Sequence, residues 1–260
     1  NAWFDYSDSF NPNSLKNVAL DGTINPSISG VLDRIEQTPH VALLWHVQPD
    51  TTASLGYRFT QINYTADEPV GGFYPDGITA MSDIRDNRSH TVYVGLDHQF
   101  RPDFYGSVQA GASYYDYYNL NDTSFGPYAR LSLTYVYMPE SSLTAGFQEG
   151  RSATDVFGGS TAATIVRDAE ASVFFANVRH RIVPKLFANL NGSFQHSAFQ
   201  GGGAFDNQSE DFYEFGANLE YQFNPHFSAH AGYDFNRLDS DLGNRSYSRN
   251  KVYIGATASY

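Results

Sequence analysis

Side chains alternate between apolar and polar with a period of two along most of this chain. In the segment FNPHFSAHAGYDF, residues 223–235, the odd-numbered positions from Phe227 onward are apolar, whereas the even-numbered ones include His230 and Asp234. Successive side chains of a β-strand point to opposite faces of a sheet. The alternation therefore predicts an all-β chain whose sheet has one apolar face and one polar face.

Two kinds of connection separate the alternating segments. Five short ones hold a proline between bulky apolar residues, at Pro49, Pro102, Pro139, Pro184 and Pro225. Proline fixes its own φ and donates no hydrogen bond, so it ends a strand cleanly. Five longer ones are rich in Gly, Asp, Asn and Ser and cover residues 65–88, 119–126, 151–168, 199–210 and 238–245. This arrangement predicts a meander of hairpins, with short turns at one end of the sheet and long loops at the other.

The connections predict eleven strands, at residues 40–48, 52–64, 89–100, 103–118, 127–138, 141–149, 169–182, 185–197, 211–223, 226–237 and 246–260. A twelfth strand is expected within residues 1–10, although this segment alternates poorly, and residues 11–37 are expected as a long loop. We interpret residues 1–260 as a single domain. Residues 1–37 would form the first strand plus a loop or plug, and residues 38–260 the eleven meander strands.

The apolar face is unusual in composition for a protein core. Ala and Gly occupy many of its central positions, and aromatic residues gather at the strand ends, as at Phe104 and Tyr114. Small residues would leave voids in a protein core, whereas lipid chains conform to them. Aromatic residues at both ends of an apolar band are typical of membrane interfaces. Lipid is therefore the predicted surrounding of this face, and a soluble barrel or sandwich is the alternative.

A sheet in hydrocarbon cannot leave backbone groups unpaired, so it has to close. The predicted fold is a transmembrane antiparallel up-and-down β-barrel of twelve strands. By the pattern of bacterial outer-membrane barrels, both termini would be periplasmic and the long loops extracellular.

The last segment, VYIGATASY, resembles the carboxyl-terminal signal of outer-membrane proteins, which the barrel-insertion machinery reads. The resemblance rests on the terminal aromatic residue and the apolar residues at every second position, namely Val252, Ile254, Ala256, Ala258 and Tyr260. More broadly, residues 38–260 resemble the putative beta-barrel porin (type 2) family in their repeated proline turns with flanking aromatic residues, as in FRPDF and FNPHF. The resemblance implies an outer-membrane barrel and, by association, a porin.

Composition excludes several other classes. The chain has no cysteine, which excludes disulfide scaffolds, thiolate zinc sites and cysteine nucleophiles. Its formal net charge of −12 argues against binding nucleic acid. The partners we expect are outer-membrane lipid and lipopolysaccharide, the latter through divalent cations at acidic loops, and the insertion machinery. A homo-oligomer or an envelope complex stays open.

The polar face would line the lumen of the barrel. Its charged and titratable residues are the predicted pore-lining residues: Arg58, Asp97, Arg130, Arg179, Arg181, Glu214, Glu220, His230, Asp234, Arg249 and Lys251. Such charges set the selectivity of a pore, or they pair with one another in a narrow interior. Twelve strands lie between the filled eight-stranded barrel and the open sixteen-stranded porin, so size does not decide.

The predicted function is passive diffusion of small hydrophilic solutes through a polar, mildly basic lumen. The alternative is a non-conducting structural or interaction barrel whose acidic loops bind a surface or envelope partner. We expect no enzyme, cofactor or metal. His230 and Asp234 share the polar face but form no recognisable catalytic motif, and the loop at Asp239 and Asp241 matches a calcium loop only in part.

Overall fold

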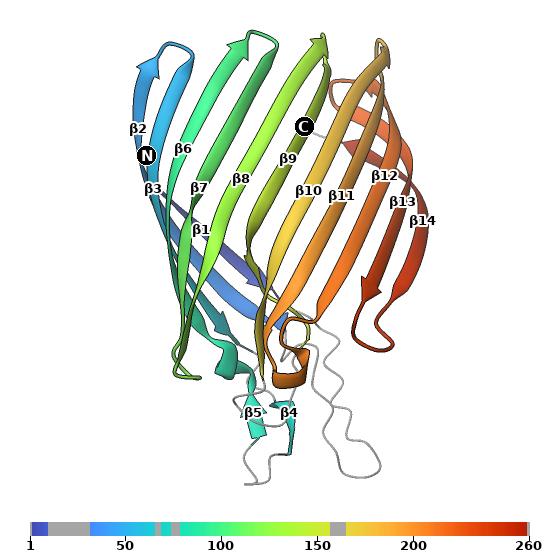
Figure 1. Cartoon of the computed structure of the whole chain (residues 1–260). Coiled ribbons are helices and arrows are strands. Elements are labelled where there is room, and N and C mark those ends of the chain that lie inside the picture. Colours follow the sequence, from blue (N-terminus) through green and yellow to red (C-terminus); the bar gives the residue numbers. More distant parts are fainter. Residues whose placement is uncertain (1, 10–31, 66–68, 74–78, 157–164, 259–260) are drawn as a thin grey trace.

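The computed structural model describes residues 2–9, 32–65, 69–73, 79–156 and 165–258. Twelve of its strands form a single antiparallel sheet in which neighbours follow chain order, without a crossover (Figure 1). These strands are β1 (Ala2–Ser9), β2 (Arg34–Gln48), β3 (Thr51–Tyr64), β6 (Asn87–Arg101), β7 (Phe104–Tyr117), β8 (Asp122–Met138), β9 (Ser141–Ser152), β10 (Val166–Val183), β11 (Leu186–Gly201), β12 (Ser209–Asn224), β13 (Phe227–Ser240) and β14 (Tyr247–Ala258). The predicted all-β, up-and-down antiparallel fold is confirmed.

The five proline turns are two-residue connections, each between paired strands, and they lie at the upper end of the sheet in Figure 1. We call this the turn end and the opposite end the loop end. In two of these turns the residue after proline, Glu140 or Lys185, has a positive φ of 60° or 77°. Proline presets φ for the first turn residue, so the chain reverses at once.

The amino-terminal part differs from the prediction. The strand expected at 40–48 begins at Arg34, because residues 34–37 pair in register with Tyr64–Gln61 of β3. The expected boundary between residues 37 and 38 therefore falls inside β2. The expected twelfth strand is β1, which pairs along Arg34–Val41. Residues 10–31, expected as a loop or plug, lie outside the described residues.

The long connection expected at 65–88 contains further structure. It holds the two short strands β4 (Pro69–Phe73) and β5 (Thr79–Met81), which pair with each other, and the 3₁₀ turn η1 (Ser82–Arg85). A second 3₁₀ turn, η3 (Gly203–Phe205), lies between β11 and β12. None of the helices in the described part of the chain has the length and apolar character needed to cross a membrane.

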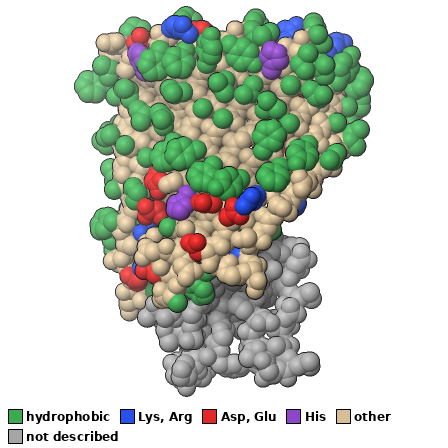
Figure 2. All heavy atoms as spheres, turned by 45° about the vertical axis from the view of Figure 1, so that its right-hand side comes forward, with side chains coloured by type: hydrophobic (Ala, Val, Ile, Leu, Met, Phe, Trp, Pro, Cys, Tyr) green, Lys and Arg blue, Asp and Glu red, His purple; other side chains and the backbone are tan. Residues whose placement is uncertain are grey.

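The apolar residues of the alternating pattern lie on the outer face of the curved sheet (Figure 2). Val94 on β6 is 62% exposed, and large hydrophobic side chains of most strands are also exposed. Figure 2 shows charged side chains at the upper rim and below the hydrophobic region, but few within it. The outer surface therefore has the apolar character that the sequence predicts for contact with lipid.

Aromatic rings border this apolar surface at both ends. Towards the loop end, ring centroids lie 4.7–6.4 Å apart along Phe59–His90–Tyr114–Phe125 and along Phe147–Phe174–Phe194–Tyr213. Towards the turn end, similar contacts join His98–Phe100–Phe104–Tyr135–Tyr137–His180 and Tyr221–Phe223–Phe227. On β8, Tyr135 follows Phe125 by ten positions. At about 3.3 Å per residue and a tilt near 40°, the rows are about 25 Å apart on this strand, the height of a barrel's apolar band.

The edges of the sheet are β1 and β14. The sheet curves round towards closure in Figure 1, yet no pairing between these two strands is present among the described residues. Barrel closure with twelve strands therefore stays a prediction.

A small apolar core sits at the loop end. Val156, Val166, Ala169, Phe199 and Leu242 are buried together, with Phe205 of η3 packed against them. These residues come from three loops and the strand ends beside them. The loops are thus packed together at the loop end, as a unit called the packed cap, which is held also by the ion pairs of Arg245 with Asp155 at 2.7 Å and Glu210 at 3.4 Å.

Candidate functional site

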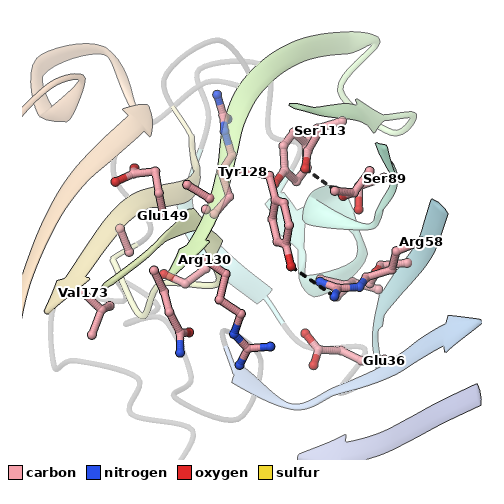
Figure 3. A pocket seen from close by; sticks show the side chains of 18 of the residues that line it. Glu36, Arg58, Ser89, Ser113, Tyr128, Arg130, Glu149 and Val173 are labelled. Carbon is pink, nitrogen blue, oxygen red and sulfur yellow. Dashed lines mark hydrogen bonds between the residues drawn. The ribbon is translucent and has the colours of Figure 1, made fainter. Parts of the chain in front are cut away.

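A polar cavity of about 380 Å³ lies on the inner face of the sheet, towards the loop end (Figure 3). Strands β2, β3 and β6–β11 contribute to its wall. The polar lining consists of Glu36, Arg58, Thr60, Asn87, Ser89, Thr91, Ser113, Tyr115, Tyr128, Arg130, Gln148, Glu149, Arg151, Ser152 and Gln195. Two predicted pore-lining residues, Arg58 and Arg130, are brought together here from β3 and β8.

Arg58 is held against an aromatic ring. Its guanidinium carbon lies 5.3 Å from the ring centroid of Tyr128, and Nη2 donates to the Tyr128 hydroxyl at 3.4 Å. The Tyr128 hydroxyl in turn donates to Gln109 at 2.9 Å. Behind it, the Tyr93 ring packs 5.5 Å from that of Tyr128. A stacked guanidinium keeps its edge N–H groups available to a ligand.

Arg130 differs from Arg58 in having no protein partner in the part of the chain that the structure describes. Its exposed side chain points into the cavity in Figure 3. Among the described residues, no hydrogen bond, ion pair or ring contact engages the guanidinium.

The other charged groups of the cavity are engaged. Glu36 forms an ion pair with Arg34 at 3.3 Å, and Glu149 accepts a hydrogen bond from Ser172. Arg151 and Asp168 form an ion pair at 3.0 Å, with side chains only 5% and 8% exposed. The Tyr117 hydroxyl also donates to Asp168.

A buried arginine lies in the connection between β5 and β6, at the loop end. Arg85, the last residue of η1, is fully buried and donates from Nη1 to the Thr154 carbonyl at 2.8 Å. Its guanidinium lies 4.7 Å from the Tyr64 ring centroid, and burial lowers the pKa of Arg85.

The neighbouring Asp86 accepts hydrogen bonds from the Tyr64 amide at 2.7 Å and from Asn63 at 3.2 Å. Burial raises the pKa of Asp86. The segment joining β5 to β6 is thereby anchored to β3 and to the connection after β9.

A second group of predicted residues gathers at the turn end. Arg179 forms an ion pair with Glu220 at 3.5 Å and lies 4.3 Å above the Phe187 ring. Arg181 forms an ion pair with Glu140 at 2.6 Å. A second cavity of about 450 Å³ lies beside them, lined by Val136, Glu140, Ser141, Ser142, Arg179, Phe187 and Gln222.

A third group lies on the last two strands. Lys251 approaches Asp234 at 3.9 Å and lies 5.3 Å above the Tyr253 ring. The His230 ring packs 6.0 Å from that of Tyr253. Arg249 donates to Asn236 at 2.8 Å when the Asn236 amide presents its oxygen.

The two remaining predicted residues line neither cavity. Asp97 lies opposite Thr52 and Ser107 in the sheet register, and Glu214 lies opposite Ser193 and Asn236. Whether any of the predicted residues lines a conducting path stays a prediction.

Sequence reasoning missed Glu36, Arg151, Asp168 and Arg85 because it assigned all four to connections. Glu36 had one usable signal: it continues the alternation of β2 beyond the expected start of that strand. The residues that surround Arg85 are far apart in the sequence, so no local sequence pattern predicted its burial.

The predicted insertion signal lies on β14. Val252 and Ile254 are 82% and 86% exposed, and Ala256 and Ala258 follow at the same spacing. Tyr260 lies outside the described residues. Recognition of this segment by the insertion machinery stays a prediction. In the part of the chain that the structure describes, no group of three or more His, Asp or Glu side chains could hold a metal ion.

Comparison with known proteins supports a porin-like chain. Residues 170–260 match the family model described as Putative beta-barrel porin 2. No curated protein matches the chain. A family and fold of this kind are non-enzymatic in character.

Three solved structures are similar in fold. The NanC porin has 15% sequence identity and a TM-score of 0.38, covering 87% of this chain and 94% of that one. A deltaS2 mutant of the TodX monoaromatic hydrocarbon channel has 11% identity and a TM-score of 0.45, covering 100% and 78%. The toluene transporter TodX of Pseudomonas putida has 11% identity and a TM-score of 0.36, covering 88% and 85%. At these values none of the likenesses bears on function.

Proposed function

We propose that this chain, which resembles the putative beta-barrel porin 2 family, is an outer-membrane channel for passive diffusion of small hydrophilic solutes. One observation carries the proposal: a curved sheet with an apolar outer face between two aromatic rows has a hollow, polar inner face. That combination suits a protein that separates lipid from water.

Solutes would be filtered by size and charge as they diffuse along the inner wall. The sequence predicted six basic and four acidic lumen residues. The first cavity adds Arg151 to the basic residues and Glu36 and Glu149 to the acidic ones, which makes seven basic and six acidic residues. The proposed lumen is therefore only mildly basic, and a weak anion preference follows.

We place the loop end outside the cell and the turn end, with both chain termini, in the periplasm. Support comes from the difference between two-residue turns and long loops, which follows the bacterial pattern. The outer face would contact lipid and the headgroup region of lipopolysaccharide, and β14 would be the strand that the insertion machinery reads. A homo-oligomer or an envelope complex remains compatible with this placement.

Planar-bilayer recordings test the proposal. Purified protein inserted into a lipid bilayer should give steady ohmic steps whose reversal potential in a salt gradient shows weak anion preference. Silence from protein shown to be folded and inserted would contradict a channel.

The second candidate function is a non-conducting barrel that presents its loops to a surface or envelope partner. The packed cap around Val166 and Phe199, and the fully buried Arg85, favour it, because packed loops offer a partner a fixed surface. Folded, inserted but silent protein would support this second function.

A further inference from the structure

We propose that the cavity at the loop end is a binding site for the carboxylate group of a small hydroxylated solute, with Arg130 and Arg58 as the groups that recognise it. The inference rests on the proposed channel function and deepens it, because it names the class of solute that would bind transiently during its passage.

Two arginines of the cavity have no acidic partner among the described residues, and together with Glu149 they leave one positive charge in excess. Arg151 is neutralised by Asp168 at 3.0 Å. Glu36 is paired with Arg34 at 3.3 Å, and Glu149 accepts a hydrogen bond from Ser172. The Arg58 guanidinium contacts the neutral side chain of Tyr128, and the Arg130 guanidinium has no protein partner among the described residues. Set against the carboxylate of Glu149, Arg58 and Arg130 leave the described part of the cavity with one positive charge in excess.

Arg58 and Arg130 are also arranged to share a ligand. They come from β3 and β8, two strands that are not neighbours in the sheet, and both line the same cavity (Figure 3). Stacking on Tyr128 limits the motion of the Arg58 side chain, so the N–H groups at the edge of its guanidinium are pre-organised for binding a ligand. The planar fork of a guanidinium matches the two oxygens of a carboxylate.

A singly charged oxyanion fits better than a doubly charged one. Glu36 and Glu149 line the same cavity and, although engaged, they repel added negative charge. Two guanidiniums can offset one carboxylate charge, whereas a phosphate monoester would bring nearly two charges to the same place. The site should therefore favour carboxylates over phosphate esters.

The rest of the wall suits a solute that carries hydroxyl groups. Thr60, Ser89, Gln148 and Gln195 offer hydroxyl and amide groups that can both donate and accept hydrogen bonds. The cavity of about 380 Å³ admits a molecule of the size of a sugar acid. Gluconate, which has one carboxylate and five hydroxyl groups, is a suitable probe.

Equilibrium binding to detergent-solubilised, folded protein tests the site without requiring conductance. Titration calorimetry should show saturable binding of gluconate, weaker binding of glycerol phosphate, and none of glucose at the same concentration. The variant Arg130→Gln should weaken gluconate binding about tenfold or more, because a charge-assisted hydrogen bond is lost. Arg130→Lys should restore part of the affinity, since it returns the charge without the planar fork.

Arg249→Gln is the matched control, since it removes one inner-face charge from β14, outside the cavity. Equal losses in Arg130→Gln and Arg249→Gln would reduce the effect to net charge and overturn the site. Equal binding of glucose and gluconate, or tighter binding of glycerol phosphate, would overturn the carboxylate class. The bilayer recordings distinguish the binding site from the channel. Conductance without gluconate binding would contradict the binding site but not the channel. Gluconate binding without conductance would support the binding site and contradict the channel.

Discussion

The ring of Tyr93 on β6 lies directly over Gly56 on β3, on the inner face of the sheet. A Cβ at Gly56 would stand 2.2 Å from Cζ of Tyr93 and 2.4 Å from its hydroxyl oxygen. This close approach lets Tyr93 lie against the wall, where its hydroxyl bonds Nε2 of His40 at 2.7 Å and its ring supports Tyr128. The glycine therefore helps to keep the interior hollow.

Gly56→Ala is expected to destabilise the folded protein by about 1–3 kcal/mol, because the methyl group displaces a buried ring from a well-packed position. Denaturant unfolding of protein refolded in lipid vesicles would measure the loss. Gly150→Ala on β9 is the control, since a Cβ there would meet nothing within 4 Å. If both variants unfold at the same denaturant concentration, the Tyr93–Gly56 contact has no energetic role.

The sequence sufficed for most of the fold because a two-residue period survives wherever one face of a strand meets lipid and the other meets water. The five prolines marked the turns for an equally local reason, since φ restriction acts within one residue. Prediction stopped where local pattern ends. Residues 34–37 are polar at three of four positions, and only Glu36 continues the alternation of β2, so the start of the strand became clear from its pairing with β3.

The charged groups of the site show the same limit. Alternation places Arg58 and Arg130 on the inner face, but their different environments depend on neighbours such as Tyr128, far away in the sequence. Arg151 and Asp168 looked like solvated loop residues, yet they form a nearly buried ion pair. Sequence patterns assign a side chain to a face; they do not assign its partner.

Charge reversal at the turn end should change ion selectivity. Arg179 is partly exposed beside the second cavity. Reversing one charge at about 8 Å from a passing ion, in a water-like medium, changes the energy of that ion by about 1 kcal/mol, a factor of about five in preference. Arg179→Glu is therefore expected to shift the reversal potential towards cations, and the shift should shrink at high salt.

Arg237→Glu on β13 controls for net charge, because the Arg237 side chain belongs to the outer face and pairs with Asp239 at 2.9 Å. It should leave the reversal potential unchanged. An unchanged reversal potential in Arg179→Glu would mean that permeating ions do not pass this arginine.

The buried arginine of η1 should hold the loop end together. Arg85→Ala leaves the Thr154 carbonyl without its donor and opens a cavity beside Tyr64. A loss of about 2–4 kcal/mol in local stability is expected. Limited proteolysis should then cut near residues 82–87 and 153–156 faster than in the unaltered protein. Arg101→Ala, which truncates an exposed arginine at the turn end, should leave the rate unchanged.

One loop contact should depend on pH. Hydrogen bonds from the backbone N–H and then the hydroxyl of Ser209, both at 2.9 Å, hold the pKa of Asp241 below its usual value of 3.8. A carboxyl whose native pKa is depressed contributes stability above the unfolded pKa and loses it as pH falls through the native pKa. Protection of the Ser209 amide from hydrogen exchange should therefore fall below about pH 3.8.

Asp241→Asn provides the comparison at each pH. Its amide oxygen can still accept from Ser209 but does not titrate, so the ratio of protection between the two proteins should change only in the acid range. A ratio that is constant from about pH 5 downward would show that the carboxylate charge contributes nothing to this turn.

The placement of the outer face in lipid can be tested with one side chain on each face of the same strand pair. Val94 on β6 is 62% exposed on the outer face between the two aromatic rows, and Ala110 of β7 is its partner in the register. Gln109, one residue away, belongs to the inner face and accepts a hydrogen bond from Tyr128.

Lysine in the middle of a barrel's lipid face costs about 2–4 kcal/mol, whereas substitutions facing the lumen are tolerated. Val94→Lys should therefore lower the unfolding free energy in vesicles by that amount, and Gln109→Lys by less than about 1 kcal/mol. In water a lysine at an already exposed position is nearly neutral. Equal stability of Val94→Lys and the unaltered protein would thus place the outer face in water and remove the basis of the channel.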